Sequence, residues 1–200
     1  MMTYAQFGDD DWIVDQFPPD FIGHACDVGA YDGVTRSNTL LLEARRWTVL
    51  CIEPNPAVAK LLKKNRSFVQ AVACDLQPKE KEKLWIHENN PEAHTALKPI
   101  TTHPVWHPEK GATFTPVIVE VDTLNHCLEK AEFPRLDVLS VDTEGNELQV
   151  LQGLDLIKWT PHVIVAESWD EDTPITPYLS EFGYRRVRRA VVNNCYRREA

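Results

Sequence analysis

The fold is decided by the stretch Asp27-Val28-Gly29-Ala30-Tyr31-Asp32-Gly33, which contains two aspartates and two glycines at the end of an apolar run over residues 24–28. A second apolar run, residues 47–52, stops at Glu53, 26 residues after Asp27. In open α/β folds, glycines after a buried strand let the backbone turn tightly against a ligand, and an acid at the tip of the next strand accepts hydrogen bonds from ribose hydroxyls. The spacing therefore predicts a site for a nucleoside-containing cofactor.

Length and composition predict a single domain over residues 1–200, because 43% hydrophobic and 26% charged residues are ordinary for a globular chain. The net charge of −9 argues against nucleic acid as a partner, which needs a basic face. We expect no membrane insertion, since every apolar run is too short to cross a bilayer. The five cysteines form no CxxC pattern, and we interpret them as reduced core residues of a cytoplasmic protein.

Strand-like and helical stretches alternate along the chain. Strands are predicted at residues 24–28, 48–53, 68–73, 83–87, 115–121, 136–141 and 162–166. Helices are predicted at residues 37–45, 56–64, 123–130, 146–152 and 175–181. An antiparallel pair of strands is predicted at residues 184–187 and 194–197, around Asn193 and Asn194. The pattern is that of an α/β fold with a mostly parallel central sheet, an antiparallel C-terminal strand and helices on both faces.

A proline- and histidine-rich segment, residues 89–116, interrupts this alternation. A loop of this length in a compact domain is often a functional lid, and its place after the third strand predicts that it covers the carboxyl ends of the sheet. Its three histidines, His94, His103 and His107, have no standard zinc-ligand spacing and no cysteine among them, so we predict no metal site.

Two basic clusters are interpreted as solvated surface, with a phosphate-bearing substrate as the alternative. One contains Lys60, Lys63, Lys64 and Arg66, and the other covers residues 185–189. The glycine stretch itself lacks the third glycine of a dinucleotide fingerprint, which disfavours NAD. Asp27 would repel a phosphate and could hold an ammonium group, so the electrostatics favour S-adenosylmethionine as the cofactor.

The chain resembles FkbM-type S-adenosylmethionine-dependent methyltransferases over nearly its whole length. The resemblance is carried by residues 4–10, 27–33, 37–39, 53–56 and 71–75, and above all by Leu136-Asp137-Val138-Leu139-Ser140-Val141-Asp142-Thr143-Glu144-Gly145-Asn146-Glu147. Tyr31 stands where such glycine motifs commonly have asparagine, and Thr143 where valine or isoleucine is frequent. The resemblance implies a Rossmann-like methyltransferase fold and S-adenosyl-L-methionine as cofactor.

The resemblance also implies a role for individual residues. Asp27, Gly29, Ala30 and Tyr31 would line the methionine end of the cofactor, with Ser37 and Asn38 near its carboxylate. Glu53 would bind the ribose hydroxyls, with Pro54 and Asn55 beside it. Cys74 and Asp75 would flank the adenine, and Asp142 would face the transferred methyl group.

Methyl transfer needs alignment of acceptor, methyl group and sulfur, and a hydroxyl acceptor also needs a base. The candidate catalytic residues are Asp142, Glu144 and His94, and a divalent metal held by the two acids remains a lesser alternative. The predicted reaction is O-methylation of a sugar or another small metabolite. A nicotinamide-dependent oxidoreductase and a non-catalytic nucleoside-binding module are the rival interpretations, and the sequence leaves the acceptor and the oligomeric state open.

Overall fold

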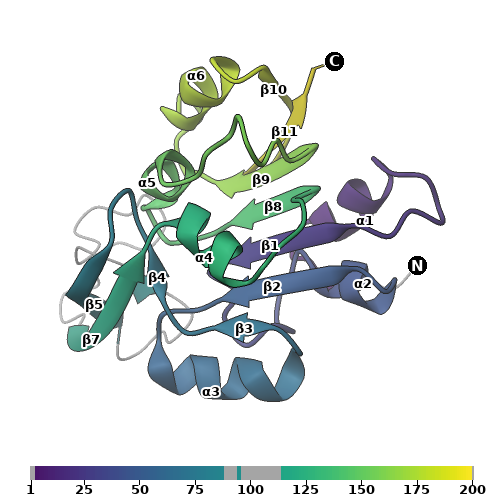
Figure 1. Cartoon of the computed structure of the whole chain (residues 1–200). Helices are drawn as coiled ribbons and strands as arrows, with labels where there is room; N and C mark the ends of the chain where they lie inside the picture. The colour runs from purple at the N-terminus through teal and green to yellow at the C-terminus, as the bar shows by residue number, and fades with distance from the viewer. Residues whose placement is uncertain (1–2, 88–93, 96–113, 200) are drawn as a thin grey trace.

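The computed structural model describes residues 3–87, the backbone of 94–95, and residues 114–199. Its centre is a seven-stranded sheet in the order β10-β11-β9-β8-β1-β2-β3 (Figure 1). These strands are β10 (Tyr184–Ala190), β11 (Asn193–Arg198), β9 (Val163–Glu167), β8 (Val138–Val141), β1 (His24–Val28), β2 (Thr48–Ile52) and β3 (Val69–Gln70). From β9 to β3 all pairs are parallel, and β11 runs antiparallel to both of its neighbours. The predicted mostly parallel sheet with an antiparallel C-terminal strand is confirmed.

Helices cover both faces of this sheet, as predicted. Buried residues of α4 (Leu124–Lys130), α5 (Glu147–Gln152) and α6 (Ile175–Ser180) share one core cluster with alternate strand residues such as Cys26 and Leu50. Buried residues of α1 (Asp9–Val14), α2 (Leu40–Ala44) and α3 (Pro56–Asn65) form a second cluster with the intervening strand residues, such as Ala25 and Val49. The two clusters arise because successive strand side chains point to opposite faces.

A second, four-stranded sheet has the order β4-β7-β5-β6 and lies beside the carboxyl edge of the first (Figure 1). Its strands are β4 (Ala73–Cys74), β5 (Lys79–His87), β6 (His94–Thr95) and β7 (Phe114–Asp122). The predicted pairing of the two extra strands is confirmed, since β5 and β7 are antiparallel neighbours. The predicted single strand over residues 68–73 is wrong. The chain leaves the central sheet after Gln70, and Ala73 pairs with Val121 of β7 instead, a partner that a local apolar run cannot indicate.

Three local predictions also differ from the structure. Helix α1 was not predicted, and α2 begins at Leu40 because Ser37 accepts hydrogen bonds from the Thr39 and Leu40 amides before the helix starts. The final turn falls at residues 191–192, while Asn193 and Asn194 belong to β11 and pair with β10 and β9.

All five cysteines are free and buried. In the described part of the chain, no helix combines the length and apolarity that a membrane span requires.

Candidate active site

A cavity of about 230 Å³ opens at the carboxyl ends of the parallel strands. Its walls include the residues that follow β1, β2, β8 and β9, together with β4 from the second sheet. This is where ligands bind in open α/β sheets, because the loops that leave the strand tips converge there. The N-terminal segment, through Gln6 and Phe7, and the turn between β10 and β11, through Val191 and Val192, complete the lining.

The turn after β1 is held in a conformation that excludes most side chains. Gly29 has a φ of 85°, and a Cβ added to it would lie 1.7 Å from the Asp142 carbonyl oxygen. Its amide and that of Ala30 both donate to the carbonyl of Ile52. Tyr31 follows with a φ of 48°, in the left-handed region where asparagine is favoured over other non-glycine residues. The tyrosine is therefore a local departure from the backbone's own preference, at a position that lines the cavity.

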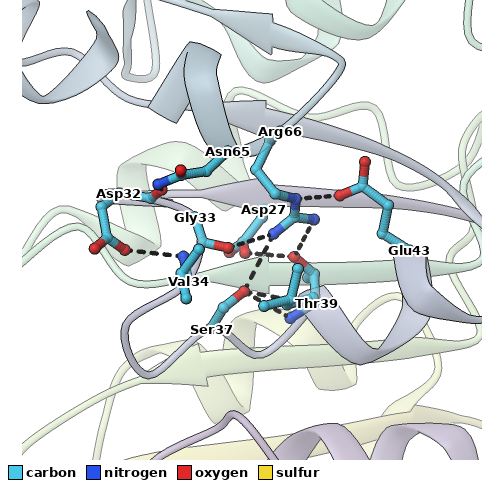
Figure 2. Close-up of polar contacts among 10 residues, drawn as sticks. Asp27, Asp32, Gly33, Val34, Ser37, Thr39, Glu43, Asn65 and Arg66 are labelled. Atoms are coloured by element: carbon cyan, nitrogen blue, oxygen red, sulfur yellow. Dashed lines mark hydrogen bonds and ion pairs between the residues drawn. The ribbon is translucent and has the colours of Figure 1, made fainter. Parts of the chain in front are cut away.

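A buried arginine at the end of α3 holds this loop in place (Figure 2). The Arg66 guanidinium donates to the Gly33 carbonyl at 2.9 Å, to Thr39 Oγ1 at 3.0 Å and to Ser37 Oγ at 3.3 Å, and it forms an ion pair with Glu43. Thr39 Oγ1 in turn donates to Asp27 Oδ2 at 2.7 Å. Arg66 is only 3% exposed, so the interpretation of it as solvated surface is wrong.

Glu53 lies directly after β2 and is 2% exposed. Its Oε2 accepts from the Tyr31 amide at 3.1 Å, and its Oε1 accepts from the Asn55 amide at 2.8 Å. Burial raises the pKa of Glu53 to about 7, although both amides act in the opposite direction. The carboxylate thus ties the β1 loop to the β2 tip, and it faces the cavity that it helps to line.

Three carboxyl groups gather on the other side of the cavity, at the tips of β8 and β9. Ligand oxygens of Asp142, Glu144 and Glu167 all lie within 4.8 Å of one another. The Asp142 and Glu167 carboxyls lie close enough together that a charge on Asp142 raises the pKa of Glu167. Oxygen clusters of this kind could also accommodate a hard divalent cation, and the absence of a metal stays a prediction.

Burial and mutual repulsion shift the acidity of this cluster. Burial raises the pKa of all three carboxyls above the ordinary range, and the neighbouring acids raise each of them further. Glu147 contributes to the repulsion but is committed to the backbone, because its Oε1 accepts from the amides of Thr143 and Gly145. Glu144 sits in this loop with a φ of 57°. A group whose pKa approaches neutrality can exchange protons at physiological pH.

Most predicted site residues line the cavity. The lining includes Asp27, Gly29, Ala30, Tyr31, Ser37, Asn38, Glu53, Pro54, Cys74, Asp142 and Glu144. Asn55 and Asp75 are buried but lie outside the lining. The Asn55 side chain accepts from the Ala57 amide at the start of α3, and Asp75 accepts from the Leu76 amide and pairs with Lys79. These contacts give both residues a structural role, and their predicted contacts with the cofactor stay a prediction.

The predicted lid largely falls outside the described residues. The backbone of His94 pairs with Ile86 in the second sheet. Its side chain, like His103, His107 and Trp106, lies in the part of the chain that is not described. Its catalytic role stays a prediction.

Sequence reasoning also missed residues that the site uses. Arg66 and Thr39 carried no signal, because a single arginine after a lysine-rich helix looks like solvent-exposed surface. Glu167 was not among the predicted catalytic residues, although its place directly at the end of an apolar strand matches that of Glu53 and Asp142. That shared position is the signal that could have found it.

Comparisons with known proteins bear on the family and the fold of the chain. The sequence profile of the Methyltransferase FkbM domain matches residues 27–186. A solved structure of the methyltransferase FkbM from Methylobacillus flagellatus KT is similar in fold, with a TM-score of 0.53 and 14% identity over 88% of this chain. The match covers 43% of that chain, so the present sequence spans less than half its length.

A weaker similarity connects the chain to the delta-N METTL16 methyltransferase domain, with 12% identity, a TM-score of 0.43 and coverage of 94% of this chain and 78% of that one. No curated protein matches the sequence. The profile match covers most of the chain, and the solved FkbM structure confirms the Rossmann-like methyltransferase fold. The chain belongs to the FkbM methyltransferase family.

Proposed function

We propose that this protein transfers a methyl group from S-adenosyl-L-methionine to a hydroxyl group of a sugar or another small metabolite. The proposal rests on the acidic groups that line the cavity, whose ionised form a nearby cation would stabilise. Among the described residues that line it, five are acids, namely Asp27, Glu53, Asp142, Glu144 and Glu167, and Arg36 is basic. Such a lining favours a cofactor that carries a sulfonium and an ammonium cation. It opposes the two phosphates of NAD, which are usually held by helix N-termini and basic groups.

The cofactor would occupy the cavity along the sheet edge. Glu53 would accept hydrogen bonds from the ribose hydroxyls, since its carboxylate is fixed by two backbone amides and needs no reordering. Cys74, on β4, would lie beside the adenine. Asp27 and the turn at Gly29 would contact the methionine portion, next to the cationic centre. S-adenosylmethionine supplies the electrophilic methyl group when bound, so the chain's own residues need to bind, orient and handle a proton.

The carboxyl cluster would take the acceptor's proton. Asp142 and Glu144 line the cavity on the side away from Glu53, beside Glu167. Burial raises the pKa of Asp142 to about 7, so it can accept a proton near neutral pH. Burial raises the pKa of Glu144 to about 9, so Glu144 would act as the base where the cofactor's cation lowers that value. His94 is the alternative base. The half-buried Trp169 on the same wall offers an apolar face of the kind that packs against a sugar ring.

Calorimetry with S-adenosylhomocysteine, S-adenosylmethionine and NAD tests the cofactor. We expect the first two to bind and NAD to bind at least about tenfold more weakly, a difference of about 1.4 kcal/mol. Tighter binding of NAD would end the proposal and favour the oxidoreductase alternative. Binding of the cofactor without turnover on any acceptor would favour a non-catalytic module.

The acceptor is best sought with methyl-labelled S-adenosylmethionine and a panel of free and nucleotide-linked sugars. The variants Glu144→Gln and His94→Ala then separate the two candidate bases. The base variant should lose roughly 10²–10⁴-fold in turnover, while its affinity for S-adenosylhomocysteine changes little. If His94 is the base, activity should also decline as pH falls through the range near ~6.5, where an unperturbed histidine gains a proton. Full activity in both variants would leave Asp142 as the remaining candidate.

A further inference from the structure

The N-terminal segment and the C-terminal hairpin meet at an ion pair between a buried aspartate and a half-buried arginine, which has no part in the mechanism above. Asp9, the first residue of α1, is fully buried, and its carboxylate forms an ion pair with Arg188 of β10. The second carboxylate oxygen accepts from Asn193 Nδ2 at 2.7 Å. The same guanidinium donates to the Phe7 carbonyl at 2.9 Å. Arg188 therefore binds the residues on both sides of Gly8, Phe7 through its backbone carbonyl and Asp9 through its carboxylate.

The segment that Arg188 binds is part of the cavity wall. Gln6 and Phe7 line the cavity, and so do Val191, Val192 and Asn193 of the hairpin that supplies Arg188. The segment leading into them is folded back on α1 by Asp10, which is also fully buried. Its Oδ1 accepts from Thr3 Oγ1 at 2.5 Å, and its Oδ2 accepts from the Tyr4 amide at 2.7 Å. Residues 4–8, which precede α1, are thus anchored at both ends.

The position of this wall separates it from the nucleoside end of the cavity. In the sheet order, β2 with Glu53 is followed by β1, β8, β9 and then β11, which begins at Asn193. Neighbouring strands lie roughly 4.8 Å apart, so the tip of β2 and the start of β11 are about 19 Å apart across the sheet. A cofactor whose ribose contacts Glu53 would have its methyl group near β8, and the wall would lie beyond it.

We propose that Asp9 and Arg188 are a positioning pair that fixes Gln6 and Phe7 as the acceptor-side wall of the cavity. This inference rests on the proposed function, because that function defines which side of the cavity the acceptor enters. The wall presents an aromatic ring and an amide next to the carboxyl cluster, a combination suited to a neutral, hydroxyl-bearing acceptor. Arg188 and Arg189 of β10 thereby bind backbone carbonyls of the protein itself. Arg189, for example, donates to the carbonyls of Ser168 and Trp169 on the same rim.

The test compares Asp9→Asn, Arg188→Lys and Arg188→Met with the control Arg185→Met, which removes an exposed arginine of the same strand whose partner, Glu199, is also exposed. Amide hydrogen exchange of residues 4–8 should speed up by about tenfold or more in Asp9→Asn and Arg188→Met, because local opening sets that rate. Arg188→Lys keeps the charge but can reach only one of the two acceptors, so its exchange should be intermediate. The control should match the wild type.

The double variant Asp9→Asn with Arg188→Met separates positioning from simple stability. Removing both charges should restore most of the urea midpoint lost in either single variant, since neither charge is then left unpaired. Exchange at residues 4–8 should nevertheless stay fast, because the contact with the Phe7 carbonyl is gone. Recovery of both the midpoint and the slow exchange would overturn the proposal, as would unchanged exchange in all variants.

Binding of S-adenosylhomocysteine decides which side of the cavity the wall serves. Phe7→Ala and Arg188→Met should keep the affinity within about twofold of wild type, because their sites are distant from Glu53. A loss of about tenfold or more would make the wall a cofactor contact and overturn the assignment to the acceptor. If wild-type protein does not bind S-adenosylhomocysteine at all, the proposed function fails, whereas a failure confined to the variants' exchange rates leaves that function intact.

Discussion

The two sides of the cavity are built on different physical terms. On the side of β1 and β2, the matched side, each acid has hydrogen-bond donors. Asp27 accepts from Thr39, and Glu53 accepts from two backbone amides. On the side of β8 and β9, the crowded side, three carboxyl groups lie together, and burial and repulsion raise the pKa of each. They belong to Asp142, Glu144 and Glu167. The first side is preorganised for a ligand. The second keeps like charges close at a cost in stability, as functional sites often do.

The largest expected effect comes from breaking the matched side at Arg66. Arg66→Met would leave Glu43 without its cation and the Gly33 carbonyl without its donor. Removing one partner of a buried charge pair typically costs about 3–5 kcal/mol, and we expect a loss of that size in the free energy of urea unfolding. The control is Lys63→Met, an exposed residue of the same helix, which should change stability by about 0.5 kcal/mol or less. Equal effects in the two variants would show that the network does not hold the loop.

Glu53 tests whether the matched side also binds the cofactor. Glu53→Gln retains one acceptor oxygen but loses the charge, and we expect affinity for S-adenosylhomocysteine to fall by about 1.5–3 kcal/mol, the usual range for hydrogen bonds to a charged group. Glu53→Ala is a poorer choice, because it would also leave the Tyr31 and Asn55 amides without their acceptor. Calorimetry gives the affinity, and urea unfolding shows whether the variant is folded. Unchanged affinity in a folded Gln variant would limit Glu53 to its structural hydrogen bonds.

The positions of the acids on both sides also explain which site residues and which fold class could be predicted from the sequence. An acid directly after an apolar run must lie at the edge of the sheet, so the places of Glu53 and Asp142 followed from strand periodicity alone. Gly29 followed in the same way, as a glycine directly after a buried strand. The fold class was predictable for the same reason, because alternating strands and helices leave few arrangements for a parallel sheet.

What could not be predicted depends on contacts between distant segments. Arg66 looks like its lysine neighbours in sequence, and its burial is decided by Gly33 and Thr39, which lie on another loop. The break between β3 and β4 depends on β7, nearly fifty residues later along the chain. Asn193 and Asn194 resemble turn residues, yet they continue β11 because Asp9 and Arg186 bind their side chains. Local patterns do not contain this information.

The acids of the crowded side should make the stability of the protein depend on pH. Burial first, and then the neighbouring acids, raise the pKa of Glu167 above the ordinary value of 4.5. The folded protein therefore binds this proton more tightly than the unfolded chain does. The contribution of Glu167 to stability is fully present below pH ~4.5, and it is lost as pH rises through the pKa of Glu167 in the folded protein. Glu167→Gln cannot ionise, and it should melt higher than the wild type at alkaline pH.

Melting temperatures from pH 5 to pH 9 measure this difference in the protein without cofactor. A gain of about 1–2 kcal/mol would raise the melting temperature by roughly 2–8 °C at the alkaline end, since each kcal/mol corresponds to about 2–4 °C at this size. The difference should shrink toward pH 5, and the exposed Glu120→Gln should show none. A constant offset between Glu167→Gln and wild type at every pH would mean that packing, rather than charge, causes the change.

The smallest effect concerns Asn55, which marks the boundary of the matched side. Its side chain accepts from the Ala57 amide at 3.0 Å and begins α3, the helix that ends beside Arg66. Asn55→Ala should cost about 1 kcal/mol of stability, the typical value of a helix N-cap. Its backbone amide, which donates to Glu53, is unaffected by the substitution, so affinity for S-adenosylhomocysteine should change by less than about twofold. Asn55→Asp is the matched rescue, because aspartate caps helices as well as asparagine does and should restore stability. A large loss of affinity in Asn55→Ala, at full stability, would instead return Asn55 to the cofactor contacts that the resemblance implies. It would also extend the binding surface past the described lining of the cavity.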